Sequence, residues 1–156
     1  VSLGEELKIA GACVKIHQGR FPGKMTFEFE CPNDLLPILV PKMFIQPIIE
    51  NALSHGLEPR GKSGLLLLRV EKCNNSRLVI TMTDNGVGIE SQRLANIIDR
   101  LNSKNVTSTE HIGIQNVHNR LWLKYGDPYG VKIHSIQGQG TTVIIQLPIK
   151  ENDMDQ

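Results

Sequence analysis

Four short segments of this chain combine polar side chains or glycines at spacings that could bind a ligand, and the first is QPIIENALSHG, residues 46–56. On a helix, Glu50 and Ser54 would share one face, because residues four apart are neighbours. By the same spacing, Asn51 and His55 would share the adjacent face. Magnesium takes oxygen ligands and keeps several waters, so one Asn carbonyl together with substrate phosphates would suit it. A solvated helix face is the alternative, and zinc binding is disfavoured because no His or Cys partner lies at ligand spacing.

The second segment is DNGVGI, residues 84–89, which places a carboxylate before two glycines. Asn-Gly is a strong hairpin signal, so a plain turn between paired strands is one interpretation. A helical pattern follows Gly88, however, rather than a strand that could pair. A carboxylate at the end of a buried strand can instead hold a ligand's amino group, while the glycines let the ligand approach the backbone. The sequence leaves both interpretations open.

The third and fourth segments are HIGIQNVHNRL, residues 111–121, and GQGTTVIIQLP, residues 138–148. In the third segment Gly113 opens a helix, and exposed backbone N–H groups with the helix dipole behind them form an anion site. Arg120 could add positive charge. The alternatives are a glycine hinge before an amphipathic helix in the third segment, and a hairpin turn before a core strand in the fourth.

The composition excludes several classes of protein. A length of 156 residues favours one domain. Lys and Arg total 17 against 16 Asp and Glu, and a net charge of +1 does not indicate a nucleic-acid binder. The three cysteines fit neither a disulfide framework nor a zinc site, and the five histidines form no ligand cluster. No apolar run approaches the ~20 residues that span a bilayer, and no phosphate-loop, dinucleotide-binding or GxSxG motif occurs.

Hydrophobic periodicity predicts the elements that must position the four segments. Helices are expected at 3–17, 42–55, 90–101 and from Gly113, and strands at 25–30, 65–72, 78–83, 131–136 and 141–147. Pro47 removes one backbone donor, so a kink or a restart is expected in the second helix. The polar stretch Asn102–Glu110 is expected to be a mobile loop. This order predicts an α/β fold, a two-layer sandwich with helices on one face of a mixed, mostly antiparallel sheet.

In their order and spacing, the four segments together resemble the Bergerat ATP-binding fold shared by gyrase, Hsp90, histidine kinases and the MutL repair proteins. ENALSHG is similar to the N box of that fold, and DNGVGI, IGIQNVHNRL and GQGTTVIIQLP are similar to its three glycine boxes. VPKMFIQPIIENALSHG, and YGDPYG after the third segment, are similar to the LytS/YesM-type sensor histidine kinases of bacteria. The similarity covers roughly residues 3–149. The opening helix, ending KIHQGRF, resembles the end of that family's dimerisation helix.

The resemblance implies a site for ATP and Mg²⁺. Asn51 would be the magnesium ligand, with His55 on the same helix face as a further nucleotide contact. Asp84 would accept a hydrogen bond from the adenine amino group. Gly86 and Gly88 would let the base lie against the backbone. The backbone N–H groups of Gly113 and the residues after it, beginning with Ile114, would meet the phosphates. Thr141 would reach the adenine through water. The stretch 102–110 would be the ATP lid.

Glu50 is the candidate catalytic residue, because it immediately precedes the magnesium Asn. ATPases of this fold carry a glutamate one helical turn before that Asn as the general base for water, and this chain has Pro47 there. Glu50 points about 100° around the helix from Asn51, given 3.6 residues per turn. It is therefore not expected to activate water at the same site, and slow hydrolysis is predicted.

Three departures from the family pattern bear on function. Ser54 stands where many histidine kinases carry a Lys that contacts phosphate. The basic residues that could replace that contact are Arg60, Lys62 and Lys104. His111 stands where a glycine often precedes Gly113. The phosphoacceptor segment is absent, and His17 lies too late in the sequence to replace it.

Together these features predict the ATP-binding catalytic domain of a two-component sensor histidine kinase, which presents ATP·Mg to a histidine outside this chain. Residues 1–20 would be the end of a dimerisation helix with its linker, 21–150 the catalytic domain and 151–156 a C-terminal tail. The expected partners are ATP, the protein's own dimerisation and phosphoacceptor domain and, through it, a response regulator, but no nucleic acid. Because the chain opens with Val1, we expect a piece of a longer protein, the cytoplasmic domain of a membrane sensor, not itself inserted in the membrane. A degenerate module that senses nucleotide or docks a partner without phosphotransfer is the alternative.

Overall fold

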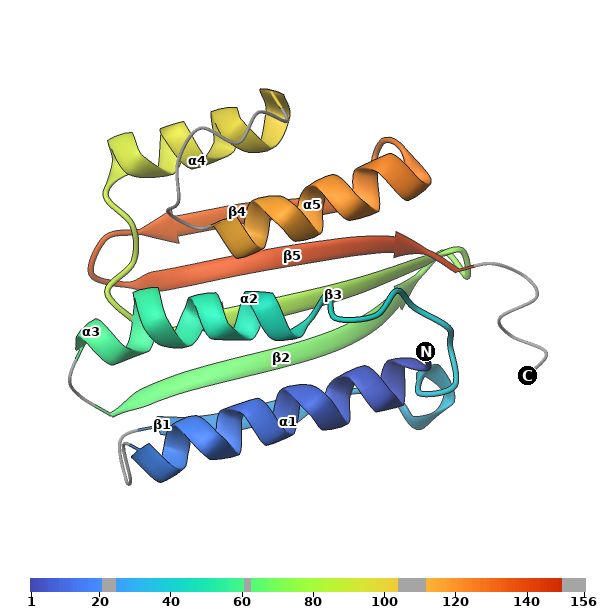
Figure 1. Ribbon diagram of the computed structural model, residues 1–156, viewed down its shortest axis with the longest axis horizontal. Helices are drawn as coiled ribbons and strands as arrows, with labels where there is room; N and C mark the ends of the chain where they lie inside the picture. Colours follow the sequence, from blue (N-terminus) through green and yellow to red (C-terminus); the bar gives the residue numbers. More distant parts are fainter. Residues whose placement is uncertain (21–24, 61–62, 104–111, 150–156) are drawn as a thin grey trace.

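The fold is a five-stranded sheet with helices across one face (Figure 1). The computed structural model describes residues 1–20, 25–60, 63–103 and 112–149. The strands are β1 (Met25–Glu30), β2 (Gly64–Cys73), β3 (Arg77–Asp84), β4 (Gly130–Ile136) and β5 (Gly140–Pro148). Their order is β1-β2-β3-β5-β4, with β1 parallel to β2 and the other neighbours antiparallel. The predicted fold class, a two-layer α/β sandwich on a mixed, mostly antiparallel sheet, is confirmed.

Three helices lie side by side across the covered face, namely α1 (Leu3–Arg20), α2 (Gln46–Asn51) and α5 (Ile112–Tyr125). α2 lies between the other two and contacts both of them. α4 (Ser91–Ser103) packs against β4 and α5. Two shorter pieces are the 3₁₀ helix η1 (Asn33–Leu35) and the helical turn α3 (Glu58–Arg60). Among the helices in the described part of the chain, none combines the length and hydropathy needed to cross a membrane.

Alternation along the central strands places one face of the sheet in the core. On β3, Leu78, Ile80 and Met82 are buried at every second position, since successive side chains of a strand point to opposite faces. Asp84 is the next member of this row and is also buried. The alternation that buries one face of β3 therefore also places the Asp84 carboxylate at the end of the strand, on the face that the helices cover.

The helix expected at 42–55 is shorter than predicted and changes its winding. It begins at Gln46, so Pro47 lies in its first turn, where the missing N–H costs nothing and no kink is required. After Asn51 the chain continues as the π-helical segment η2 (Ala52–Leu57), which the periodicity did not predict. The N–H of Glu58 donates to the carbonyl of Leu53, the five-residue spacing that defines a π-helix. Such segments occur frequently at functional sites.

α1 belongs to the same core as the sheet. It runs to Arg20, three residues beyond the predicted end, and buries Leu3, Leu7, Ala10 and Val14 against the other elements. Whether residues 1–20 form a unit separate from residues 21–150 stays a prediction.

Three predicted features fall wholly or largely outside the described residues. The stretch 102–110 was expected to be a loop. Its first two residues instead belong to α4, which continues through Ser103, and residues 104–110 lie outside the described residues. His111 and the tail 151–156 also lie there.

The buried row of the sheet predicts a large difference between two otherwise identical substitutions. Leu68 on β2 is fully buried, whereas Leu123 on α5 is 76% exposed. Leu68→Ala should lower the free energy of unfolding by about 2–5 kcal/mol, because it removes buried methyl groups and leaves a cavity. Leu123→Ala, the matched control, should change it by less than about 0.5 kcal/mol. Urea denaturation of both variants measures the difference, and similar losses would contradict the assignment of the buried face.

Candidate functional site

Side chains from three predicted segments meet around one small cavity beneath α2 and η2. Of the residues predicted to bind nucleotide, those that line it are Asn51, His55, Asp84, Gly88 and Thr141. The remaining lining residues are Ala52, Gly56, Met82, Ile89 and Val143. Segments that are distant in the sequence thus converge because β3 and β5 are paired, with Asp84 directly opposite Thr141.

Asp84 is the buried charge of this cavity, with 5% of its surface exposed. Its Oδ1 accepts a hydrogen bond from the Gly86 N–H at 2.8 Å. Burial raises the pKa of the carboxyl group, while the hydrogen bonds from the backbone N–H groups of Gly86 and Thr141 act in the opposite direction. A buried carboxylate that lines a cavity is an acceptor for the N–H group of a ligand.

DNGVGI does not form the hairpin turn that Asn-Gly allowed. The Asn85 side chain instead accepts the Leu65 N–H at 2.7 Å, and the Arg60 guanidinium donates to the Asn85 carbonyl. The Val87 N–H donates to the Gly56 carbonyl at 3.0 Å, and the Val87 carbonyl accepts the Gly138 N–H at 2.6 Å. The segment therefore bridges η2 to the β4–β5 turn, and of the two interpretations the structure excludes the hairpin.

The two glycines of this segment are required by the protein itself. A Cβ at Gly86 would lie 2.3 Å from the Gly56 carbonyl oxygen. Gly88 has φ +71°, and a Cβ there would lie 2.2 Å from the Ile136 carbonyl oxygen. Backbone thus fills the space beside both α-carbons. A direct contact of these glycines with the base stays a prediction.

Ser135 of β4 supports the cavity and was not predicted from the sequence. Its hydroxyl donates to the Gly140 carbonyl at 2.9 Å and accepts the Ile89 N–H at 2.9 Å. The Thr141 hydroxyl lies 2.9 Å from the same oxygen and can donate to it. One serine therefore holds both Ile89, at the end of DNGVGI, and Thr141. Only the pairing of β4 with β5 places it there, so no local motif could have identified it.

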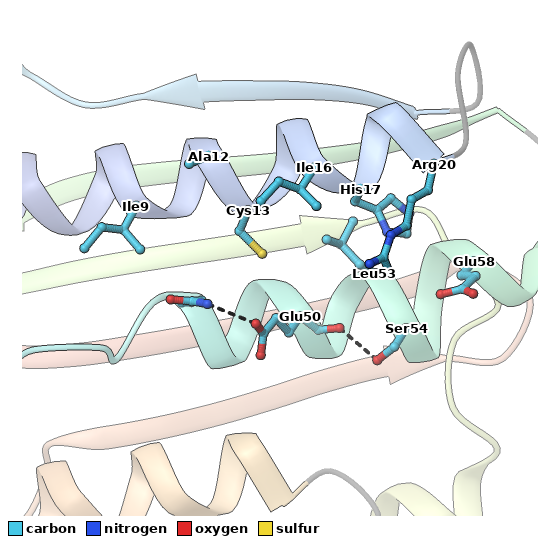
Figure 2. Close-up of a pocket in the computed structure, with 11 residues that line it drawn as sticks. Ile9, Ala12, Cys13, Ile16, His17, Arg20, Glu50, Leu53, Ser54 and Glu58 are labelled. Carbon is cyan, nitrogen blue, oxygen red and sulfur yellow. Dashed lines mark hydrogen bonds between the residues drawn. The ribbon is translucent and has the colours of Figure 1, made fainter.

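Glu50, the candidate catalytic residue, lies away from the cavity at Asp84. It lines a groove of about 480 Å³ between α1 and the α2–η2 segment. Figure 2 shows Glu50 there together with Cys13, His17 and Ser54. Its carboxylate accepts from the Gln46 side chain at 3.0 Å, and the Ser54 hydroxyl donates to its backbone carbonyl at 2.8 Å. Ser54 therefore lines this groove and is not among the residues that line the cavity at Asp84.

The predicted phosphate contacts lie at the start of α5. Gly113 lies against the first turn of α2, where an added Cβ would be 3.4 Å from the Pro47 carbonyl oxygen. The Ile114 side chain is fully buried in the core, so only its backbone could meet a ligand. Of the basic residues proposed to replace a phosphate-binding Lys, Arg60 already holds Asn85. Lys62 and Lys104 lie outside the described residues.

The donor set of the site fits magnesium only together with phosphates. Among the described residues, no group of three or more His, Cys, Asp and Glu side chains is arranged to hold a metal ion. Asn51 offers one amide oxygen, the hard type of ligand that magnesium takes, and the cation would obtain its remaining ligands from phosphates and water.

The cavity is nearly closed. Its volume is about 10 Å³, whereas ligand pockets typically measure about 300–1,000 Å³. Entry of a nucleotide base therefore requires lining side chains to move. Asn51 and His55 belong to the helical segment α2–η2, whereas Asp84 and Thr141 belong to the paired strands β3 and β5.

Comparison with known proteins places these features in a family. A family model described as histidine kinase-, DNA gyrase B-, and HSP90-like ATPase matches residues 41–151. The sensor histidine kinase YesM of Bacillus subtilis is 29% identical over 150 residues, which cover 96% of this chain and 24% of that protein. The sensor protein kinase HptS of Staphylococcus aureus is 30% identical over 155 residues, which cover 99% of this chain and 29% of that protein. The chain spans about a quarter of the length of these relatives.

Solved structures share the fold. The catalytic domain of histidine kinase ThkA matches with a TM-score of 0.71 and 14% identity, over 98% of this chain and 96% of that one. Histidine kinase ThkA in complex with response regulator protein TrrA also matches, with a TM-score of 0.65 and 13% identity, over 96% of this chain and 41% of that one.

The burial of Asp84 predicts how the stability of the protein depends on pH. Because the pKa in the folded state is raised above its ordinary value of 3.8, the stabilising contribution of Asp84 is complete below that pH. It is lost as the pH rises through the folded-state pKa. Wild type should therefore lose stability as the pH rises from below 3.8, and Asp84→Asn should not. The difference in the free energy of unfolding, Asp84→Asn minus wild type, should increase over this range. Urea denaturation over a pH series measures it.

Glu90 provides a control in which the pKa shift, and therefore the pH dependence of stability, has the opposite sign. Hydrogen bonds from the backbone N–H groups of Gln92 and Arg93 lower its pKa below 4.5, so its contribution is lost as the pH falls. Glu90→Gln should become less stable, relative to wild type, as the pH rises. The same trend in both variants would contradict the burial of Asp84.

Proposed function

Since the chain belongs to the family of histidine kinase-, DNA gyrase B- and HSP90-like ATPases, we propose that it is the ATP-binding catalytic domain of a two-component sensor histidine kinase. The observation that carries the proposal is the buried Asp84 carboxylate, which lines one cavity together with Asn51, His55 and Thr141. The similarity to YesM and HptS supports the kinase assignment over the other activities of the family.

Asp84 would select adenine. Its ionised carboxylate only accepts hydrogen bonds, and the exocyclic amino group of adenine donates them. Guanine presents a carbonyl oxygen at the equivalent position, so an acceptor would face an acceptor. Because Asp84 is already held by Gly86, its orientation is fixed before a ligand arrives.

Asn51 would hold the magnesium ion that accompanies the triphosphate. When bound, this cation neutralises the charge of the phosphates, which is a main requirement of phosphoryl transfer. The role of the chain itself is to bind and orient. Asn51 and Asp84 would fix the two ends of the nucleotide, and the backbone N–H groups at Gly113 would meet the phosphates between them.

The position of Glu50 supports phosphoryl transfer to a protein rather than hydrolysis. Its side chain lies in the groove against α1, and Pro47, one turn before Asn51, has no side-chain acceptor. α2 therefore presents no carboxylate that could activate water at the cavity. The accepting histidine would belong to the protein's own dimerisation domain, and a response regulator would take the phosphoryl group from it. We place the domain in the cytoplasm, as part of a membrane sensor.

ATP binding should stabilise the chain in an Asp84-dependent way. With Mg²⁺ and a non-hydrolysable ATP analogue at one hundred times Kd, linkage adds about 2.7 kcal/mol to the stability of the folded state. For a domain of this size that corresponds to a rise in melting temperature of roughly 5–10 °C. Asp84→Asn should lose the rise because its amide can present a donor to the adenine donor. Asp99→Asn, at an exposed aspartate of α4, should keep it. Equal shifts in wild type and Asp84→Asn would refute the adenine assignment.

Hydrolysis should be very slow and should not depend on Glu50. Loss of a general base typically costs 10²–10⁴-fold in rate, and no such base faces the cavity from α2. Steady-state phosphate release by wild type, Glu50→Gln and Glu58→Gln, a neighbour in the same groove, should therefore be equally low. Turnover on the order of 1 s⁻¹ that Glu50→Gln abolishes would make the protein an ATPase.

A further inference from the structure

The turn that precedes α2 is held from two sides by charged side chains of other helices. Glu6 of α1 is 2% exposed, and its carboxylate accepts the Met43 N–H at 2.6 Å and the Phe44 N–H at 3.3 Å. Arg120 of α5 donates to the Met43 carbonyl at 3.1 Å and to the Lys42 carbonyl at 2.5 Å. We call Glu6, Arg120 and the turn Lys42–Phe44 between them the α2 clamp.

α2 depends on this clamp because it has no cap of its own. Ile45, the residue before the helix, makes no side-chain capping bond, and Pro47 offers no N–H in the first turn. A negative charge near a helix N-terminus interacts favourably with the helix dipole. Glu6 supplies such a charge from a different helix, and burial excludes the water that would screen it.

The clamp also fixes an unfavourable backbone conformation. Met43 has φ 56°, in the left-handed region that residues with a Cβ avoid. Its side chain is 54% exposed, so packing of that side chain does not impose the conformation. The hydrogen bonds of Glu6 and Arg120 to the backbone of the turn are what hold it. Backbone strain that the surrounding structure holds in place is concentrated at active sites, ligand-binding segments and switch regions.

The clamp joins the three helices beside the predicted phosphate site. α2 begins at Gln46, two residues after Phe44 of the clamp, and its six residues end at Asn51. The predicted phosphate glycine, Gly113, is the second residue of α5 and lies against Pro47, and the same helix carries Arg120 two turns further on. A displacement of α1 would thus reach Asn51 through Glu6 and the start of α2.

We propose that the α2 clamp positions Asn51 for the magnesium-bound phosphates, and thereby couples the placement of α1 to the binding of ATP·Mg. The inference rests on the proposed function, because it takes Asn51 as the magnesium ligand. Glu6 and Arg120 are positioning residues, since neither lines the cavity at Asp84. Asp84 lies on β3 and is held by Gly86, so the clamp should leave base recognition unaffected.

A loss of the clamp should therefore weaken binding of the phosphates and leave binding of the base unchanged. Isothermal titration of the full chain gives Kd for a non-hydrolysable ATP analogue with Mg²⁺ and for adenosine, which lacks the phosphates. Glu6→Gln keeps the shape but removes the charge, and Arg120→Gln removes the donors from the other side. Each should weaken binding of the analogue by roughly 5–150-fold, the usual range of coupling between sites, and leave the Kd of adenosine unchanged. The double variant should lose no more than the larger single loss, because both side chains act on one turn.

The matched controls are exposed residues of the same helices, Glu5→Gln on α1 and Lys124→Gln on α5, and both should bind the two ligands as wild type does. Because Arg120 is exposed, Arg120→Gln keeps the test available if Glu6→Gln does not fold. Unchanged binding of the analogue by Arg120→Gln, or equal losses for the analogue and adenosine, would overturn the clamp. Failure of the wild type to bind either ligand would instead overturn the proposed function.

Discussion

The burial of one carboxylate sets the conditions that the rest of the site must meet. A charge removed from water is costly unless hydrogen bonds replace its hydration. Asp84 obtains them from the N–H groups of Gly86 and Thr141, so the chain must turn sharply after β3 and β5 must pair closely beside it. Gly140, with φ +118°, permits this approach, because a Cβ there would lie 2.0 Å from the Asp84 carbonyl oxygen.

The start of α2 is also held by a buried carboxylate. A second buried carboxylate, Glu6, is satisfied by the N–H groups of a turn rather than by a cation. Both carboxylates therefore hold backbone, one at the end of β3 and the other before α2. On the exposed side of the same turn, Arg120 donates hydrogen bonds to the carbonyl groups of Lys42 and Met43. Between these two fixed points lies the helical segment that carries Asn51 and His55, with its change from α to π winding after Asn51.

Local patterns predicted most of the fold because burial on one face imposes a period. The strands predicted at 65–72 and 78–83 fall one residue short of β2 and β3 at each end, and helical spacing predicted α1, α4 and α5. The failures occur where tertiary contacts override periodicity. The helix expected at 42–55 loses its first residues to the clamped turn, because Met43 takes a left-handed conformation that no local propensity favours.

The sequence by itself determined which side chains could serve a nucleotide. Asn51, His55, Asp84 and Thr141 stand in recognisable segments, and the structure brings them to one cavity. Only the tertiary structure decided how they are supported. Ser135 joins the site through the pairing of β4 with β5, Glu50 is turned into the groove against α1, and Glu6 reaches the start of α2 across 37 residues. The physical reason is that a motif specifies side-chain chemistry and local spacing, whereas the direction of a side chain and the partner of a buried charge depend on which elements pack together.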